Sequence, residues 1–387
     1  MDEPALDVGD ERVVAVGPIA HGGHAVAHAD GRTLFVRYAL PGERVRVRVT
    51  QVARRIVRAD AVEVLEPSAD RVVPPCPVFG PGGCGGCDFQ HATPAAQRGL
   101  KERVLADCLS RIGRMPAEES AALDLRVREL PGHPDALRWR TRVGWATGPD
   151  GVVGLRRHRS HDVVAVDDCL IAVPEASRPG SKQPTFVEHV VRDRRWRVPG
   201  DGFWQVHPQA ADAFVDAVLR LAEPKPGESW WDLYSGAGLF AAFVGQAVGT
   251  DGSVDAVEAD AAANRSARRA LHDLPQVHLH AADVRTWLST APGRPDGVVL
   301  DPPRAGAGPA IVDAIAERAV PRVVYVACDP AALARDVALL RAHGYHLAVV
   351  EAYDAFPMTH HIETIALLRL DDAQIASASP RDATLAS

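Results

Sequence analysis

The beginning of the chain alternates apolar and polar residues in short runs that are separated by turns. The run Glu-Arg-Val-Arg-Val-Arg-Val at residues 43–49 has the period of two that is typical of a half-buried β-strand. Shorter apolar runs at residues 13–16 and 33–36 are bounded by glycine and proline turns. We therefore expect residues 1–66 to form a small all-β, OB-like barrel.

Arginines recur at the exposed positions of this predicted barrel. In that spacing they could line one surface that binds the phosphate groups of a nucleic acid. The solvated face of a small barrel would carry the same pattern, so both interpretations stay open. The residues concerned are Arg44, Arg46, Arg48, Arg54, Arg55 and Arg58.

Residues 67–200 are expected to form a central α+β region. From Pro94 to Ile112, apolar residues recur every four positions, which predicts an amphipathic helix. Cys108 lies on the apolar face of that helix, so we predict a buried core thiol rather than a metal ligand.

A basic segment follows this helix. Between residues 138 and 161, six arginines oppose a single acidic residue and are interleaved with Trp139 and Trp145. Positive charge beside aromatic rings is typical of proteins that bind unstacked RNA. We favour that interpretation over a solvated hairpin, which would look similar.

From about residue 201, buried strands alternate with helices, which is typical of a doubly wound, Rossmann-like α/β domain. We expect this domain to cover residues 201–370. The tail at 371–387 is rich in Ser, Ala and Asp and is expected to be disordered. Predicted strands end at Leu233, at Glu258, near Asp283, at Asp301 and at Cys328, and a last one covers Thr364–Leu370.

The composition narrows the class of protein. A chain of 387 residues with 47% hydrophobic and 24% charged residues is long enough for two or three globular domains. The net charge of −7 gives no global sign of a polyanionic partner, so any RNA site must be a local patch. Without a membrane-spanning stretch or a secretory signal, a cytoplasmic location is expected. No feature calls for a protein partner, so we expect a monomer.

Three cysteines crowd into twelve residues, as Cys76-x7-Cys84-x2-Cys87. Neighbouring glycines let the backbone bend so that several thiolates converge, and in a reducing compartment such a cluster indicates a metal site. Cys169 is the best candidate for a fourth ligand. Four thiolates suit tetrahedral zinc or a [4Fe-4S] cluster. Because a second close pair is missing, we favour the iron-sulfur cluster, with zinc and unliganded thiols as alternatives.

Residues at the predicted strand ends form a candidate nucleotide site. Gly236 and Gly238 follow the first strand and would let a ligand approach a helix N-terminus. Glu258 would accept hydrogen bonds from ribose hydroxyls, and Asp283 would bind an adenine amine. Asp301, held by the two prolines that follow it, would project into the same cleft. The third glycine of the dinucleotide motif is missing, so S-adenosylmethionine fits better than NAD.

Cys328 ends a predicted strand beside this site. A lone cysteine is usually a core residue. Its position at the carboxyl edge of the sheet nevertheless favours a nucleophile.

Over about residues 10–370 the chain resembles the RNA (uracil-5-)-methyltransferases of the TrmA/RumA type. The resemblance is carried by the four-cysteine pattern and by Asp301-Pro-Pro-Arg304, Tyr325-Val-Ala-Cys328-Asp-Pro330 and Thr359-His-His-Ile-Glu363. It implies an RNA-binding TRAM barrel, a [4Fe-4S] site and a methyltransferase domain. In this resemblance Cys328 is the nucleophile and Glu363 is the base. The residues that would contact S-adenosylmethionine are Gln205, Tyr234, Glu258, Asp283 and Asp301.

The resemblance implies C5-methylation of a uridine in structured RNA. The thiolate of Cys328 would add to C6, C5 would take the methyl group, and Glu363 would remove the C5 proton. 23S rRNA is favoured as the substrate over the tRNA T-loop. The main alternative is an iron-sulfur RNA-binding protein, a chaperone or a sensor, with an inactive transferase domain. A methyltransferase for DNA or a small molecule is the third hypothesis.

Four positions differ from the commonest family pattern: His207, Ser235, Leu239 and Asp329. None of them removes an expected catalytic atom. Asp329 places a carboxylate directly after Cys328, which would raise the pKa of the thiol and slow the reaction unless a nearby cation offsets it.

Overall fold

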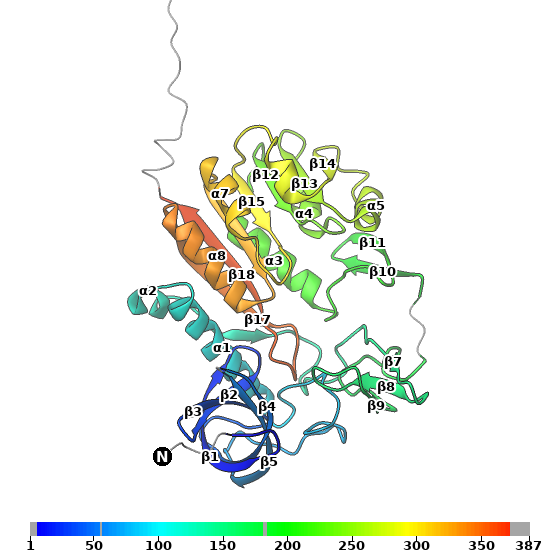
Figure 1. Ribbon diagram of the computed structural model, residues 1–387. Helices are drawn as coiled ribbons and strands as arrows, with labels where there is room; N and C mark the ends of the chain where they lie inside the picture. Colours follow the sequence, from blue (N-terminus) through cyan, green and yellow to red (C-terminus); the bar gives the residue numbers. More distant parts are fainter. Residues whose placement is uncertain (1–5, 55, 181–183, 372–387) are drawn as a thin grey trace, which may run out of the picture.

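The structure is a computed structural model that describes residues 6–54, 56–180 and 184–371. The predicted disordered tail therefore lies outside the described residues, apart from Asp371. Figure 1 shows a small barrel at one end of the molecule, a larger α/β unit at the other, and the central segments between them. No helix of the described part is both long and apolar enough to span a membrane.

The first five strands close into a barrel in the order β1-β2-β3-β5-β4 (Figure 1). Val45, Val47 and Val49 are at most 1% exposed, because the alternation along β4 turns every second residue into the barrel. The predicted all-β barrel is confirmed. Its strands are β1 (Glu11–Ala20), β2 (His24–Ala29), β3 (Arg32–Arg37), β4 (Arg44–Val52) and β5 (Val57–Glu66).

The arginine-rich face of the barrel is balanced by acidic residues. The pairs are Arg44 with Glu66, Arg46 with Glu63, and Arg48 with Glu11. Most of these side chains are exposed. Each of these three arginines is therefore partly neutralised by a carboxylate, as on the solvated surface of a small barrel. Phosphate binding by this face stays a prediction. Arg55 lies outside the described residues.

The central part begins with a long helix, α1 (Pro94–Arg111), which matches the predicted one to within a residue. Thr93 caps its N-terminus by accepting the N–H of Ala96, and Pro94 fits the first turn because that turn needs no donor there. Cys108 is 3% exposed, so the prediction of a core thiol is confirmed. The other elements are α2 (Ala117–Ala121), β7 (Ala146–Thr147), β8 (Val153–Arg156), β9 (Val163–Ala165), and the hairpin of β10 (Phe186–Val191) and β11 (Arg194–Pro199).

The tryptophans of the basic segment do not offer free rings. Trp139 is fully buried, in a small core that also contains Cys87 and Ile171. Trp145 is half-buried, and its ring nitrogen donates to the carbonyl of Ala176. Stacking of an RNA base on Trp139 is therefore excluded in this structure.

The α/β unit contains an eight-stranded sheet in the order β14-β13-β12-β15-β16-β18-β17-β6. The strands β14, β13, β12, β15 and β16 run parallel to one another, whereas β18 is antiparallel to both of its neighbours. The predicted α/β class is confirmed, but β17 was not predicted. The strands are β6 (Val127–Glu129), β12 (Ser229–Leu233), β13 (Ser253–Glu258), β14 (Val277–Ala281), β15 (Gly297–Leu300), β16 (Arg322–Ala327), β17 (Tyr345–Asp354) and β18 (Glu363–Leu370).

Helices cover both faces of this sheet. One buried cluster joins the sheet to α3, α4 and α5, and the other joins it to α1, α6, α7 and α8. The central segment is not separate from this unit, because β6 pairs in parallel with β17 and Arg194 of β11 bonds the carbonyl of Ala270 in α5. The helices are α3 (Ala210–Ala222), α4 (Leu239–Val248), α5 (Ala261–Ala270), α6 (Val284–Leu288), α7 (Pro309–Glu317) and α8 (Pro330–Ala342).

A buried ion pair ties α1 to the end of β17. Lys101 Nζ lies 2.5 Å from a carboxylate oxygen of Asp354 and 3.1 Å from the carbonyl of Phe356, and both charged side chains are at most 3% exposed. We expect Lys101→Met to lower the free energy of unfolding by about 3–5 kcal/mol, because it leaves a buried carboxylate without its cation. Urea unfolding at pH 7 measures this change.

The matched control is Lys225→Met, since Lys225 is exposed and its substitution should change stability by less than about 0.5 kcal/mol. A loss for Lys101→Met as small as that of the control would show that the pair contributes nothing to stability.

Candidate active site

The turn after β12 brings the backbone close to the ligand side of the sheet. Tyr234, Gly236 and Gly238 all adopt positive φ angles there, and the turn leads directly into α4. A side chain at Gly238 would place its Cβ 2.6 Å from Leu271 Cδ1, so helix packing leaves no room for one. The two predicted glycines therefore shape a tight turn at the N-terminus of a helix.

Three carboxylates gather at the carboxyl edge of the sheet. Glu258 ends β13, and its carboxylate accepts the N–H of Gly236 at 2.9 Å. Asp301 directly follows β15. Asp232 of β12 is 1% exposed; one carboxylate oxygen accepts the N–H of Ala241, and the other is buried without a partner. Sequence reasoning missed Asp232 as a site residue, although it opens the glycine motif.

Burial and mutual repulsion make two of these groups unusually basic. Burial raises the pKa of Asp232 to about 8, with further increases from Asp301 and Glu258. Burial, followed by repulsion from Glu258, raises the pKa of Asp301 to about 7. A cationic ligand would relieve this repulsion, so the edge is suited to a positively charged molecule.

The other predicted ligand-binding residues come from separate segments. Asp283 is exposed and caps α6 by accepting the N–H of Thr286. Tyr234 is half-buried. Burial raises the pKa of its hydroxyl, and the charge of Asp283 raises it further. Gln205 is half-buried in the segment between β11 and α3.

The antiparallel pairing of β16 with β18 brings Cys328 and Glu363 together. Ala327 is opposite Thr364, whose hydroxyl donates to the carbonyl of Ala327 at 3.0 Å. The next opposed positions are Cys328, directly after β16, and Glu363, the first residue of β18. Opposed residues of antiparallel strands lie about 5 Å apart at their Cα atoms. Two residues far apart in the sequence therefore share one end of the sheet.

Burial disfavours the charged forms of both groups in the free protein. Burial raises the pKa of Cys328 to about 11, and the charges of Glu363, Asp301 and Asp329 add to the shift. Glu363 is 3% exposed, and burial and then Asp301 raise the pKa of its carboxyl well above its ordinary value.

Arg304 opposes these shifts, since its charge lowers the pKa of both Cys328 and Glu363. Sequence reasoning used Arg304 only as part of a motif and missed this role, because only the fold brings its charge near both groups.

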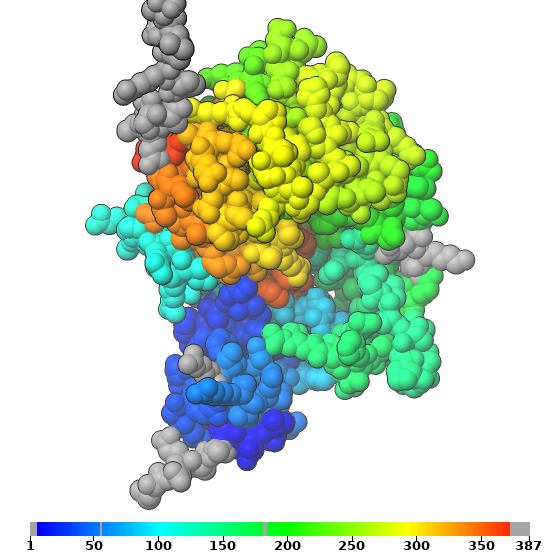
Figure 2. All heavy atoms as spheres, turned by 45° about the horizontal axis from the view of Figure 1, so that its top comes forward, coloured from blue at the N-terminus to red at the C-terminus, as the bar shows by residue number. Residues whose placement is uncertain are grey.

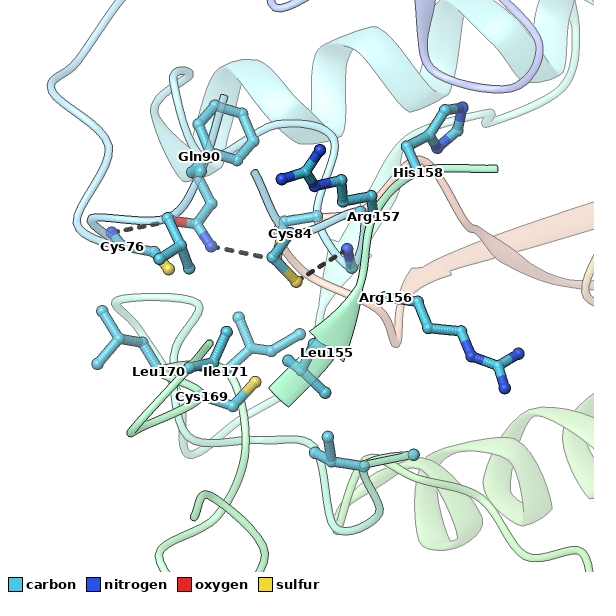
Figure 3. Close-up of a pocket in the computed structure, with 18 of the residues that line it drawn as sticks. Cys76, Cys84, Gln90, Leu155, Arg156, Arg157, His158, Cys169, Leu170 and Ile171 are labelled. Atoms are coloured by element: carbon cyan, nitrogen blue, oxygen red, sulfur yellow. Dashed lines mark hydrogen bonds between the residues drawn. The ribbon is translucent and has the colours of Figure 1, made fainter. Parts of the chain in front are cut away.

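The four predicted cysteine ligands line one cavity of about 380 Å³. In Figure 3 the sulfur atoms of Cys76, Cys84 and Cys169 point into it. Gln90 connects the two ends of the cysteine loop. Its amide nitrogen donates to Cys87 Sγ at 3.1 Å, and its amide oxygen accepts a hydrogen bond from the N–H of Cys76. All four thiols are free, and burial raises the pKa of Cys84, Cys87 and Cys169.

The donor set of this cavity suits a sulfur-ligated centre. Four thiols from two segments line the cavity, and the cation of Arg140 lies close enough to Cys169 and Cys87 for their charges to act on its pKa. Among the residues that the structure describes, however, no three His, Cys, Asp or Glu side chains lie together in an arrangement that could hold a metal ion. The iron-sulfur domain therefore stays a prediction.

Comparisons with known proteins agree with this geometry. A family model for tRNA (uracil-5-)-methyltransferase matches residues 294–370, and a model for the TRAM domain matches residues 6–62. An uncharacterized RNA methyltransferase from Streptomyces coelicolor is 40% identical, with 95% of this chain and 94% of the relative covered. A protein named 23S rRNA (uracil(1939)-C(5))-methyltransferase RlmD, from Alkalilimnicola ehrlichii, is 31% identical over 92% of this chain and 96% of its own length.

The fold also has a solved counterpart. The crystal structure of a Pyrococcus abyssi tRNA (uracil-54, C5)-methyltransferase, in complex with S-adenosyl-L-homocysteine, matches with a TM-score of 0.67. It is 21% identical, and the match covers 92% of this chain and 99% of the other. With its TRAM barrel, its α/β domain and these relatives, the chain belongs to the RNA (uracil-5-)-methyltransferase family and is an RNA methyltransferase.

Proposed function

We propose that this protein transfers a methyl group from S-adenosylmethionine to C5 of one uridine in structured RNA, through a covalent intermediate on Cys328. The observation that carries the proposal is the pairing of β16 with β18, which sets Cys328 opposite Glu363 at the edge where Asp301 follows β15. A nucleophile, a base and an acidic ligand site then share one end of the sheet.

The residues at this edge fit S-adenosylmethionine. The turn at Gly236 and Gly238 would leave room for the nucleoside, and Glu258 would accept hydrogen bonds from its ribose hydroxyls. The crowded carboxylates Asp232 and Asp301 favour a cation, and the ligand carries a sulfonium and an ammonium group. When bound, S-adenosylmethionine supplies an electrophilic methyl group. Its other contacts in this proposal are Gln205, Tyr234 and Asp283.

The chemistry follows from the two opposed residues. The thiolate of Cys328 forms a bond to C6 of the uracil, and the electron pair of the 5,6 double bond makes C5 a nucleophile. C5 would bond to the methyl carbon of S-adenosylmethionine while the bond from that carbon to sulfur breaks, and the electron pair would go to the sulfur of the departing S-adenosylhomocysteine. C5 then carries both a methyl group and a hydrogen. Glu363 removes that hydrogen as a proton, the double bond forms again, and the C6–S bond breaks to release the thiolate.

Activation of Cys328 requires a change in its surroundings. With a pKa of about 11 in the free protein, the thiol carries little thiolate at pH 7. Arg304 is the cation that counters the surrounding carboxylates, and ligand binding at Asp301 would remove one source of repulsion. We infer that the cofactor and the RNA complete the activation of the nucleophile.

The favoured substrate is 23S rRNA. The relative named for 23S rRNA is 31% identical over nearly the whole chain, whereas the structure named for tRNA is 21% identical. The target uridine must leave its stack to reach Cys328, which is only partly exposed, so a uridine in a loop is the better substrate.

We further propose that Cys76, Cys84, Cys87 and Cys169 hold a [4Fe-4S] cluster with a structural role. The lining of one cavity by all four supports this, and so does the hydrogen bond from the Gly85 N–H to the carbonyl of Arg156, which ties the cysteine loop to β8. The reaction needs no electron transfer, so a redox role is not required.

The first prediction separates the two catalytic residues. We expect Cys328→Ala to lower methyl transfer to unmodified 23S rRNA at least about 10³-fold, because no adduct forms. Glu363→Gln should instead accumulate a covalent RNA–protein complex, because the C5 proton stays in place. Labelled S-adenosylmethionine and denaturing gels measure the two outcomes.

The matched control is Glu317→Gln, an exposed glutamate at the end of α7, which should keep full activity. Unmodified tRNA is tested in parallel to decide between substrates. Methylation by Cys328→Ala at the normal rate would disprove the covalent route. Tight RNA binding without any transfer would favour an RNA-binding protein with an inactive domain.

The second prediction concerns pH. Since the pKa of Asp232 is about 8 and that of Asp301 about 7, both carboxyls bind protons at pH 7, and a cationic ligand lowers both pKa values. Binding of S-adenosylmethionine should therefore release about one proton at pH 7, and its affinity should rise from pH 6 to pH 8. Calorimetry in buffers of different ionisation enthalpy measures the protons released. S-adenosylhomocysteine, which lacks the sulfonium charge, should release fewer, and equal release for the two ligands would contradict the acidic site.

The third prediction tests the role of the cysteine site. We expect anaerobically purified Cys84→Ser to lose the visible absorption of an iron-sulfur cluster, to give less folded protein, and to bind RNA more weakly. Cys108→Ala is the matched control and should keep the absorption, because Cys108 lies in a different core. Retained stability and RNA binding, with loss of catalysis alone, would count against a structural role.

A further inference from the structure

The turn between β1 and β2 of the barrel reaches the catalytic edge. His21, the first residue after β1, has its Nε2 atom 3.0 Å from a carboxylate oxygen of Asp329, although 308 positions separate them in the sequence. Asp329 is the residue next to the proposed nucleophile Cys328. Figure 2 shows the blue barrel lying directly against orange and red atoms of the last part of the chain.

The same turn also touches the segment that carries the base. Gly23 has a φ of +77°, and a Cβ on it would lie 2.9 Å from His360 Cβ and 3.3 Å from Asp88 Cβ. His360 stands three residues before Glu363, and its ring nitrogen lies 2.6 Å from the carboxylate of Asp88. Arg37 of β3 adds a second barrel contact to this carboxylate, at 3.4 Å. One barrel turn thus packs on both the nucleophile side and the base side.

The contact with Asp329 has a defined geometry. One oxygen of Asp329 caps α8 by accepting the N–H of Ala332 at 2.8 Å, and the other faces His21. Burial raises the pKa of Asp329, but the hydrogen bonds from His21 and Ala332 outweigh burial and hold the pKa below its ordinary value. The carboxylate is therefore ionised, and His21 must donate the hydrogen on Nε2.

The hydrogen bond from His21 to Asp329 changes the electrostatic potential at the Cys328 thiol. The charges of three carboxyl groups, from Glu363, Asp301 and Asp329, raise the pKa of the thiol in addition to burial, whereas the charge of Arg304 lowers it. A donor on Asp329 draws negative charge away from the thiol side. His21 is thus the nearby partner that offsets the carboxylate next to Cys328.

We propose that the β1–β2 turn is part of the active site, with His21 as a positioning residue that fixes Asp329 and offsets its charge beside Cys328. This inference rests on the proposed function. It gives the barrel a role in catalysis that is distinct from RNA binding, and it explains how a carboxylate is tolerated directly after the nucleophile.

The first test measures the thiol itself in the full-length protein. Alkylation of Cys328 by iodoacetamide at pH 7 is followed by mass spectrometry of its peptide, which separates it from the other five cysteines. We expect His21→Ala to slow this reaction about threefold, because an uncompensated carboxylate disfavours the thiolate. His28→Ala is the matched control, since His28 lies on β2 and is exposed, and it should react like the unmodified protein.

The second test asks whether the effect passes through Asp329. Asp329→Asn keeps a side-chain oxygen for the α8 cap but removes the charge, so adding it to His21→Ala should restore alkylation to within about twofold of the unmodified protein. In methyl-transfer assays, His21→Ala should lower kcat about fivefold and change the KM for RNA less than twofold. Thermal unfolding of each variant shows whether the fold is kept.

The outcomes are decisive for the inference. Unchanged alkylation in folded His21→Ala, or a loss that Asp329→Asn does not relieve, would overturn it. A change in KM alone would assign the turn to RNA binding instead. Because alkylation needs neither RNA nor S-adenosylmethionine, it tests the role of His21 even if no methyl transfer is found.

Discussion

The antiparallel insertion of β18 between β16 and β17 is the feature on which the rest of the site depends. In a purely parallel sheet, the start of β18 would lie at the opposite edge from the end of β16. Reversal of this one strand places Glu363 opposite Cys328, and the hydroxyl of Thr364 bonds the carbonyl of Ala327 to hold the register. The acidic residues of the parallel strands then meet this pair at the same edge.

The sequence was sufficient for features that depend on local pattern. The alternation in β4, the four-residue spacing in α1 and the strand ends at Glu258 and Asp301 follow from hydrophobic periodicity, and the structure agrees with them to within one residue. Features that depend on contacts between distant segments could not be predicted. The strand β17, the charge of Arg304 acting on Cys328, and the unpartnered oxygen of Asp232 are visible only in the fold.

What the sequence left open and what it misjudged have the same physical origin. For Arg44, Arg46 and Arg48 the sequence left two interpretations open, because the glutamates that pair with them lie on other strands. Trp139 looked available for stacking because sequence spacing does not show that a small core closes around its ring. A charge or an aromatic ring can be found in a sequence, but whether it is free depends on long-range packing.

The hydrogen bond between His21 and Asp329 bears on how the enzyme is made. Ribosomal synthesis proceeds from the N-terminus, and a domain such as the barrel can fold while later residues are still being added. His21 is thus synthesised long before Asp329. The residues that surround the nucleophile are complete only when nearly the whole chain has emerged from the ribosome. An incomplete chain would carry a folded barrel and no assembled catalytic edge, so methyl transfer would have to wait for the end of synthesis.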